Sequence, residues 1–422
     1  SDHFALESHR TLCGYSNRSS LPPYDTCARR ISKVVGNFRD VISFPTLLNY
    51  QRLMTLKMAD LVCGEYPTIT VSKEDKREEL KDIREIVGFD EKLYEAVIDI
   101  SRYGEAIQRI YLDPSGEYKT FTNWEHSEWF PIVSQDGTRT ILKHVLCWRV
   151  NESSKEYAPA WRLHVQIHGT TPADIGFYEY RKYTMDSHGG AVGRLLETSR
   201  VPTGLESCAV RQLKAYSTTN TIYGYDDYMP LDSILSEIMT RVGQISVILD
   251  KHDDPNITGP TSMLSTNPAT GELYLETGKF FAVSPGEQSA SYMVWEGQLE
   301  AAFKELELLI NQLYILSEMG SALLGSKDGS SQAISSVAMR FKMINPLAKA
   351  RRIANSLTRP TKSLFAELLE GVEVKDISIV WSDGLPDNPR ELIVLIRLAT
   401  GREQLIPLAA DLAEYLGQSD RE

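Results

Sequence analysis

One stretch of the sequence has the glycine and lysine content of a loop that binds phosphate. Gly320 and Gly325 are separated by four residues, and Lys327 follows soon after the second glycine. A phosphate-binding loop requires the order G-x-x-x-x-G-K-[ST] between a strand and a helix, so that backbone amides and the lysine meet the phosphates. Here Ser326 precedes the lysine, Asp328 follows it, and the residues before the loop predict a helix. The sequence therefore does not favour nucleotide binding.

Two short groups combine histidine with carboxylates, which are side chains that ligate metal ions. They are His252–Asp254 and Glu125–Glu128. A helix end followed by Pro255 explains the first group as capping and turn residues, and the second has no partner cluster. The motifs G-x-S-x-G, H-E-x-x-H and P-C-x-x-C are absent from the sequence. We therefore expect no metal or catalytic site, and keep as an alternative a metal-dependent phosphate-ester hydrolase of α+β fold that uses Asp226–Asp227 and His252–Asp254.

The composition limits the classes to which the protein can belong. Its 422 residues are 42% hydrophobic and 24% charged, as in a folded globular protein. A net charge of −12 has the wrong sign for a uniformly basic surface that grips nucleic acid. No apolar run approaches the ~18 residues of a membrane span, and the first residues lack the features of a signal peptide. The five cysteines have neither zinc-site nor disulfide-framework spacing, which predicts a reducing compartment: Cys13, Cys27, Cys63, Cys147 and Cys208.

The first half of the chain predicts a mixed block of helices and strands. Apolar residues at helical spacing predict helices over 44–63, 73–86 and 90–103, with a strand over 67–71 between the first two. Aromatic and β-branched residues then predict six strands, over 105–112, 120–122, 130–133, 140–149, 161–168 and 176–185. Residues 187–204 read as a hairpin tip or loop.

The second half predicts long helices around a small group of strands. Apolar stripes predict helices over 231–251 and 289–319, with short strands at 273–276 and 279–283 between them. Residues 320–331, rich in glycine and serine, predict a loop. A helix over 332–369 is expected to bend at Pro346 and Pro360. The remaining elements are a strand over 374–381 and helices over 390–400 and 405–416.

Two neighbouring stretches carry opposite charge. Between Gly329 and Ala366 there is no acidic residue, and the positive charges are Arg340, Lys342, Lys349, Arg351, Arg352, Arg359 and Lys362. The helix before it is acidic, with Glu296, Glu300, Glu305, Glu307 and Glu318 against Lys304. The two stretches can neutralise each other, within one chain or between neighbouring chains, or the basic one can form a band that meets a polyanion. Both interpretations can hold in part.

The order of these elements, together with several short motifs, resembles the portal proteins of tailed bacteriophages, of the type found in siphophages. Lys57–Pro67 is similar to the family's "helix, G-E-x-P, strand" opening, and Tyr103–Ala106 with Ile110–Gly116 to its "G-[DE]-A, strand, D-x-x-G" unit. Trp124–Pro131 with Asp136–Gly137 resembles the segment that follows. Tyr223–Asp227 resembles "Y-G-x-S-D", with Asp226 where serine is more usual, and Gly329–Ile334 resembles the loop-to-helix entry "S-G-x-A".

The resemblance implies an α+β portal fold and a division of the chain. The implied parts are a wing (1–228), a stem helix (229–251), a clip (252–288), a second stem helix (289–318), a tunnel loop (319–334), a wing return with the long bent helix (335–385) and a helical crown (386–422).

The resemblance also implies a function. Such proteins form rings, typically of twelve copies, at one capsid vertex, and double-stranded DNA passes through the ring during packaging and ejection. The implied partners are the large terminase, then a head-tail adaptor, and the major capsid and scaffolding proteins. The implied location is the virion, and the host cytoplasm during assembly. No enzymatic activity, cofactor, metal or membrane is implied, and acidity suits a channel that must hold phosphate weakly.

Carried onto this sequence, the resemblance implies three groups of site residues. The tunnel loop that meets DNA would comprise Ser326, Lys327, Asp328, Gly329, Ser330, Ser331 and Gln332. The basic band would comprise Arg340, Lys342, Lys349, Arg351 and Arg352. The clip would dock partners through Asn256, Thr258, Tyr274, Glu276 and Lys279. A scaffold or adaptor protein that only oligomerises shares most of these physical features and is a further alternative.

Overall fold

The computed structural model describes most of the chain between residues 48 and 382. The described residues are 48–116, 118–153, 160–186, 190–216, 218–219, 221–253, 299–324 and 341–382, with short pieces between 257 and 292. The chain divides into two compact units. Unit 1 comprises Ser1–Arg52 and Tyr228–Ser317, and unit 2 comprises Leu53–Asp227 and Glu318–Glu422. Helices and strands are mixed, so the predicted α+β class is confirmed.

The helical part of unit 2 follows the prediction closely. Helix α3 (Tyr50–Cys63), which begins in unit 1, leads to strand β1 (Thr68–Val71), and a 3-10 turn, η1 (Glu74–Lys76), precedes α4 (Arg77–Ile86). Helix α5 (Phe89–Tyr103) ends at Gly104, whose φ of 79° lies in the left-handed region that glycine adopts without strain. The expected helix over 73–86 thus has a 3-10 first turn, and the helix over 90–103 is confirmed.

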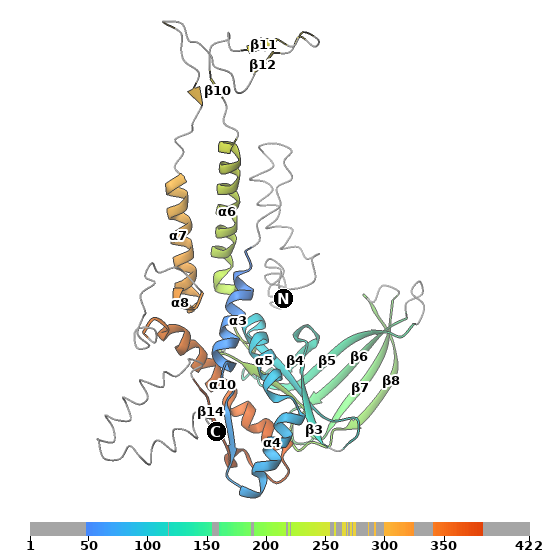
Figure 1. The fold of residues 1–422 in the computed structure, drawn as a ribbon. Coiled ribbons are helices and arrows are strands. Elements are labelled where there is room, and N and C mark those ends of the chain that lie inside the picture. Colours follow the sequence, from blue (N-terminus) through green and yellow to red (C-terminus); the bar gives the residue numbers. More distant parts are fainter. Residues whose placement is uncertain are drawn as a thin grey trace, which may run out of the picture. The chain divides into compact units, whose positions relative to one another are not determined.

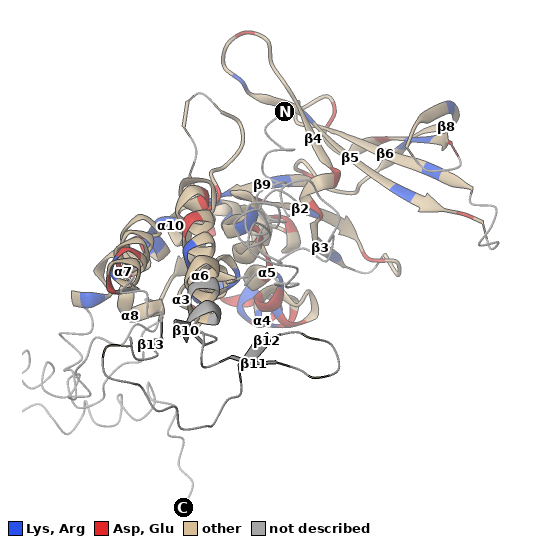
Figure 2. Cartoon of the chain, turned by 90° about the horizontal axis from the view of Figure 1, so that it is seen from above, with Lys and Arg blue, Asp and Glu red and all other residues tan. Residues whose placement is uncertain are grey.

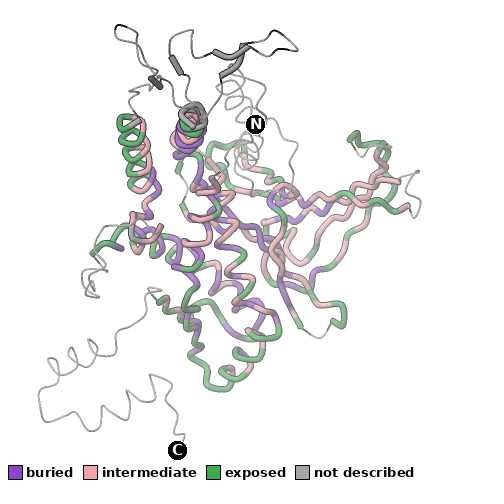
Figure 3. The backbone as a smooth tube through the Cα atoms, turned by 45° about the horizontal axis from the view of Figure 1, so that its top comes forward, coloured by how far each residue is buried: buried purple, intermediate pink, exposed green. Residues whose placement is uncertain are grey.

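A three-stranded antiparallel sheet forms the centre of unit 2. Its order is β3 (Lys119–Trp124), β2 (Glu105–Leu112) and β9 (Val210–Lys214). Helices α5 and α10 (Ile344–Leu368) pack on it. The ring of Phe89 lies 4.9 Å from that of Phe365 and 6.3 Å from that of Phe121, and all three are buried. Figure 3 shows that buried residues concentrate in these helices and this sheet.

A five-stranded sheet extends from the same unit and follows the chain in order (Figure 1). Each strand is antiparallel to its neighbour. The strands are β4 (Trp129–Val133), β5 (Ile141–Asn151), β6 (Trp161–Gly169), β7 (Phe177–Met185) and β8 (Val192–Pro202). The first four were expected. The loop expected over 187–204 is wrong, because β8 pairs with β7 along its length. Nearly all residues of β8 are exposed, so the alternation that marks a half-buried strand is missing from its sequence.

Unit 1 contains an antiparallel pair of helices. A 3-10 turn, η3 (Met229–Leu231), precedes α6 (Asp232–Asp253), which packs against α7 (Leu299–Leu316), as seen in Figure 1. Short strands lie between them in the chain: β10 (Ile257–Thr258) pairs with β13 (Ser291–Tyr292), and β11 (Leu264–Thr266) with β12 (Leu273–Leu275). Because β10 follows α6 and its antiparallel partner β13 precedes α7, the two helices run in opposite directions.

Several predicted boundaries in the second half are corrected. The helix expected over 289–319 begins too early, since 291–292 form β13 and α7 begins at Leu299. The loop expected from 320 begins with a short helix, α8 (Gly320–Leu324), whose alanine and leucines favour helix. Strand β9 was not expected. The strand expected over 374–381 is a 3-10 turn, η5 (Val374–Asp376), followed by β14 (Ile377–Val380), which pairs with β1. Residues 279–283, 325–340 and 383–422 lie outside the described part.

The two prolines of the long helix behave differently from each other. Pro346 is the third residue of α10, where the helix has no partner for a backbone N–H, and the helix expected over 332–369 is interrupted at Met343, just before it. Pro360 lies inside α10, as expected. None of the helices in the described part of the chain is long and apolar enough to cross a membrane.

Two buried histidines lie opposite each other on β5 and β6. His144 pairs in register with His168, and both are buried. The indole N–H of Trp129 donates to Nδ1 of His144 at 3.1 Å. Burial lowers the pKa of His144 to about 4. Burial, followed by the charges of Arg109 and His144, lowers the pKa of His168 to about 3. Both side chains are therefore neutral in the folded protein at neutral pH.

This pair predicts a loss of stability in mild acid. An unfolded histidine takes up a proton near pH 6.5, whereas these two do so near pH 4 and 3, so stability falls as the pH drops below 6.5. At pH 5 each contributes a loss of about 2 kcal/mol. The free energy of unfolding in urea at pH 7 and pH 5 measures it, and His168→Phe should remove about 2 kcal/mol of the difference. An unchanged pH dependence in His168→Phe would contradict the assignment.

Candidate functional site

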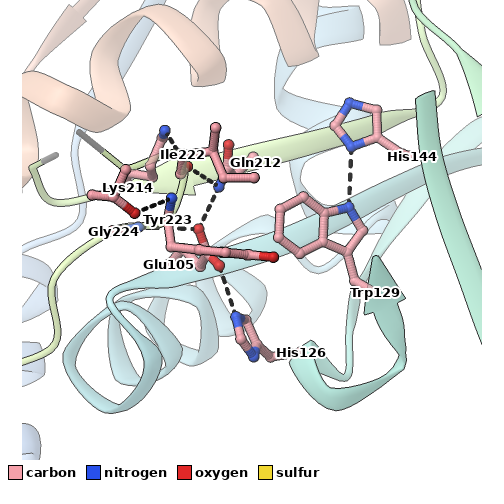
Figure 4. A network of polar contacts seen from close by, with 10 residues as sticks. Glu105, His126, Trp129, His144, Gln212, Lys214, Ile222, Tyr223 and Gly224 are labelled. Atoms are coloured by element: carbon pink, nitrogen blue, oxygen red, sulfur yellow. Dashed lines mark hydrogen bonds and ion pairs between the residues drawn. The ribbon is translucent and has the colours of Figure 1, made fainter. Parts of the chain in front are cut away.

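Three motifs that are far apart in the sequence meet around one buried carboxylate. Glu105 begins β2 directly after Gly104, and its side chain is 0% exposed. His126 comes from the 3-10 turn η2 (His126–Glu128) before β4, and Gly224 from the segment before unit 1. Figure 4 shows these residues, with Gln212 of β9, arranged around the Glu105 carboxylate. We call Glu105, His126, Gln212 and Gly224 the Glu105 cluster.

Both oxygens of the Glu105 carboxylate have partners. Oε1 lies 2.7 Å from Nε2 of His126. Oε2 accepts a hydrogen bond from the backbone N–H of Gly224 at 3.2 Å and another from the side-chain amide of Gln212. A buried carboxylate costs several kcal/mol unless such bonds replace its water. Because the partners come from three separate segments, the carboxylate fixes their positions relative to β2.

The partners of Glu105 are themselves held in place. The ring of His126 stacks on that of Tyr103, with centroids 4.9 Å apart and the planes 9° from parallel. Gln212 also donates to the carbonyl oxygen of Ile222 at 3.0 Å, and Lys214 donates to the same oxygen at 2.8 Å. This fixes the segment that carries Gly224 against β9 (Figure 4).

The two glycines of the motifs are required by a close backbone contact. A Cβ atom on Gly224 would lie 1.9 Å from the carbonyl oxygen of Gly104. A Cβ on Gly104 would lie 2.4 Å from the carbonyl carbon and oxygen of Gly224, and Gly104 also has a positive φ. No side chain fits between backbones that approach so closely. The glycines in "G-[DE]-A" and "Y-G" thus have a common physical cause.

A second buried contact follows three residues later. Asp227 Oδ1 lies 2.7 Å from Nζ of Lys349 on α10, and Oδ2 accepts a hydrogen bond from the hydroxyl of Ser101 at 2.7 Å. The side chains of Lys349 and Asp227 are only 8% and 13% exposed. Ser101 in turn lies 3.0 Å from the hydroxyl of Thr55. Asp227, the last residue of this part of unit 2, is therefore tied to α3, α5 and α10.

The residue at which the chain returns from unit 1 to unit 2 also contacts α10. Glu318, the first residue of the returning chain, lies 2.8 Å from Arg352. The guanidinium of Arg352 also lies 5.6 Å from the ring centroid of Tyr216. Lys349 and Arg352 are three residues apart and hence neighbours on one side of α10. One turn of α10 therefore binds both residues at which the chain of unit 2 is interrupted.

The sequence-predicted residues are placed unevenly. Of the basic band, Lys349 is buried in its ion pair, Lys342, Arg351 and Arg352 are exposed, and Arg340 lies outside the described residues. Of the clip residues, Thr258 lies in β10 and Tyr274 in β12. The remaining site residues fall outside the described part: Asn256, Glu276, Lys279, Ser326, Lys327, Asp328, Gly329, Ser330, Ser331 and Gln332.

The histidine and carboxylate groups do not assemble into a metal site in the described part of the chain. His126 is bound to Glu105, and Asp227 to Lys349. Asp254 lies outside the described residues. Among the residues that the structure describes, no three histidine, cysteine, aspartate or glutamate side chains are close enough to hold a metal ion. The arrangement around Glu105 can position backbone segments, which is a structural role.

The partners of the Glu105 cluster could not be read from the sequence. Gln212 in this cluster, and Ser101 and Thr55 in the contact of Asp227, lie outside the quoted motifs, and each makes its contact over a large separation in the chain. The only available signal was the glycine beside Glu105 and the glycine of Tyr223–Asp227, and neither indicates its partner. No protein-family model and no curated protein matches this sequence.

The glycine contact gives a first prediction for this site. Gly224→Ala should lower the free energy of unfolding by at least about 3 kcal/mol or prevent soluble expression, because its Cβ overlaps the Gly104 backbone. Gly190→Ala is the matched control, since a Cβ there meets nothing closer than 3.7 Å. Urea unfolding of the two variants measures the difference. Equal stability of both would show that the two backbones do not approach as described.

The buried ion pair gives a second prediction. Asp227→Asn keeps a hydrogen-bond acceptor for Ser101 but removes the carboxylate beside Lys349, and should cost about 3–5 kcal/mol of stability. The double variant Asp227→Asn with Lys349→Met should recover most of this loss. Glu318→Gln, which breaks the exposed pair with Arg352, should cost less than about 1 kcal/mol. Urea unfolding of the four proteins would refute the pairing if the double variant were the least stable.

Proposed function

We propose that this protein is a portal protein of a tailed bacteriophage, and that copies of it form a ring, most simply of twelve, through which double-stranded DNA enters and leaves the capsid. The observation that carries the proposal is the excursion of the chain through unit 1. The chain leaves unit 2 after Asp227, forms the antiparallel pair α6 and α7 with short strands between them, and returns at Glu318. This is the order of stem, clip and stem that the sequence resemblance implies.

Exposed apolar residues on α7 support assembly. Leu308 and Ile315 are 58% and 64% exposed, and Phe303 and Leu316 are about half exposed. Leu308 and Ile315 are seven residues apart, so they lie on the same side of the helix. Apolar side chains grouped in this way mark a surface that another molecule covers. In a ring, a neighbouring copy covers them.

The Glu105 cluster supports the family assignment from a different direction. The motifs that resemble the portal family include Gly104–Ala106, Trp124–Pro131 and Tyr223–Asp227. The first supplies the buried carboxylate of Glu105, and the other two supply its partners His126 and Gly224. Because the three motifs meet in one buried cluster, a shared structural role explains their joint occurrence better than chance does. In the proposed function the ring has no catalytic activity of its own.

The partners follow from the proposed role. The strands between α6 and α7, with Thr258 and Tyr274, would dock the large terminase during packaging and the head-tail adaptor afterwards. The outer parts of the ring would contact the major capsid and scaffolding proteins. The proposed locations are the host cytoplasm during assembly and the portal vertex of the virion.

Electron microscopy and mass measurement test the proposal. The purified full-length chain should give rings with a central hole in negative stain, and a mass near 570 kDa for twelve chains of 47.5 kDa. Ile315→Asp should shift the protein to smaller species by placing a charge in the covered surface, whereas Gln312→Asp, about 60° away around the helix, should keep the ring. A monodisperse monomer of the unmodified chain at micromolar concentration would sink the proposal.

A further inference from the structure

Two exposed helix faces in this chain carry complementary side chains. The α7 face consists of Glu300, Lys304, Glu307, Leu308, Asn311 and Ile315. The α10 face consists of Ile344, Ala348, Arg351, Arg352, Asn355 and Arg359. At about 100° per residue, the members of each face fall within about 100° of the helix circumference. All twelve residues are exposed. Figure 2 marks the charged residues of both helices by sign.

Charges on both faces are left without a partner among the described residues. On α10, Arg352 is bound to Glu318, but Arg351 and Arg359 form no ion pair or hydrogen bond with another residue that the structure describes. On α7, Glu307 is likewise unpaired within the described part of the chain. Glu300 has only the exposed Lys304 one turn away. One face therefore offers carboxylates and the other guanidinium groups.

The order of side chains along the two faces determines the relative direction in which the two helices can pack. On α7 the carboxylates come first and the apolar residues Leu308 and Ile315 follow. On α10 the apolar Ile344 and Ala348 come first and the arginines follow. Only an antiparallel arrangement places Ile315 against Ile344 and Glu300 against Arg359. A parallel arrangement would bury Ile315 against Arg359.

The two faces also have the same length. Glu300 to Ile315 and Ile344 to Arg359 each comprise sixteen residues, and the end residues are separated by about 22 Å at 1.5 Å per residue. In the antiparallel register every member of one face meets a member of the other. The pairs are Ile315 with Ile344, Asn311 with Ala348, Leu308 with Arg351, Glu307 with Arg352, Lys304 with Asn355, and Glu300 with Arg359. Glu307 then also lies next to the unpaired Arg351.

A groove beside the α10 face has room for the apolar side chains. It has a volume of about 1230 Å³ and lies between α10 and the residues of β14. Its walls include Ile344, Leu347 and Ala348 on one side and Val380 and Trp381 on the other. Val380 is 64% exposed. The groove also reaches Arg351, Arg352 and Asn355, so it runs along most of the α10 face, and its apolar residues near Ile344 offer a surface for the side chain of Ile315.

We propose that the α7 face of one copy packs antiparallel on the α10 face of a second copy, with Ile315 at the groove beside Val380 and Glu300 and Glu307 against Arg359 and Arg351. The proposal rests on the proposed ring, for which it supplies one contact between neighbouring chains. It assigns the exposed arginines of α10 to protein contact rather than to DNA. The opposite charges of the two stretches then neutralise each other between chains.

Disulfide trapping between separately prepared chains tests this contact. Asn311→Cys chains mixed and assembled with Ala348→Cys chains should form a disulfide-linked dimer on oxidation, because the two positions face each other across the helices. Gln312→Cys chains mixed with Ala348→Cys chains are the matched control and should give at least tenfold less dimer, since residue 312 lies about 100° further around α7. Each variant alone and the unmodified chain measure the background from the native cysteines.

The outcomes separate this contact from the proposed ring. Rings without the disulfide would overturn the contact and leave the portal function standing. In a chain that carries both Asn311→Cys and Ala348→Cys, a disulfide within that chain, with none in the mixture, would overturn the contact in favour of packing within one chain. A disulfide-linked dimer in the mixture of Asn311→Cys and Ala348→Cys chains, together with an unmodified protein that forms no rings, would support the contact and overturn the portal function. Neither dimers nor rings would overturn both.

Charge reversal distinguishes a protein partner from DNA. Glu300→Arg and Arg359→Glu should each raise the concentration at half assembly by about fivefold, and the two together should restore it to within about twofold. A 30-base-pair duplex at the same salt concentration is the second probe. If Arg359→Glu weakened duplex binding tenfold but left assembly unchanged, the α10 face would be a DNA surface and the proposal would fail.

Discussion

The burial of the Glu105 carboxylate is the constraint on which the rest of unit 2 depends. A charged group with no exposed surface is tolerated only where each oxygen keeps a partner, and here the partners are a histidine, a glutamine and a backbone amide from three segments. If one of those segments moved away, the Glu105 carboxylate would lose a hydrogen-bond partner that replaces water. The close contact of Gly104 with Gly224 allows the approach, and the stack of His126 on Tyr103 orients one partner. The chain therefore reaches Asp227 along a fixed path.

From Asp227 onward, α10 controls how the chain enters and leaves unit 1. Lys349 binds Asp227 in a nearly dry environment, whereas Arg352, three residues later, binds Glu318 at the surface. The positively charged residues of α10 thus differ in burial: Lys349 is buried and Arg352 is exposed. Lys349 serves the fold of one chain, and Arg351 and Arg359 remain exposed. The positive charges between 330 and 365 therefore have two roles. Lys349 pairs with a buried carboxylate inside the chain, and the exposed arginines are available at the surface.

Regular elements with one buried face were predictable, and contacts between distant residues were not. The helix over 90–103 followed from apolar periodicity, because the core selects apolar residues on one side, and the buried strand over 105–112 followed from its aromatic and β-branched residues. Strand β8 was missed because both of its faces are exposed. Lys349 was grouped with surface arginines, since sequence shows its charge but not the carboxylate that buries it. Gly104 and Gly224 were recognised as motif residues, but their contact with each other is a property of the folded backbone alone.

The two ion pairs on α10 also differ in what they allow. Breaking the buried pair would leave a charge without water, so Asp227 is held as firmly as the core around it. The exposed pair exchanges with water and salt at little cost, so Glu318 can release Arg352 without loss of the fold. Glu318 itself has a left-handed φ of 59°, a conformation that a residue other than glycine adopts only when its surroundings require it. At the return, Ser317 and Met319 on either side of Glu318 are buried, so packing holds the chain there, whereas at Asp227 a buried ion pair does so.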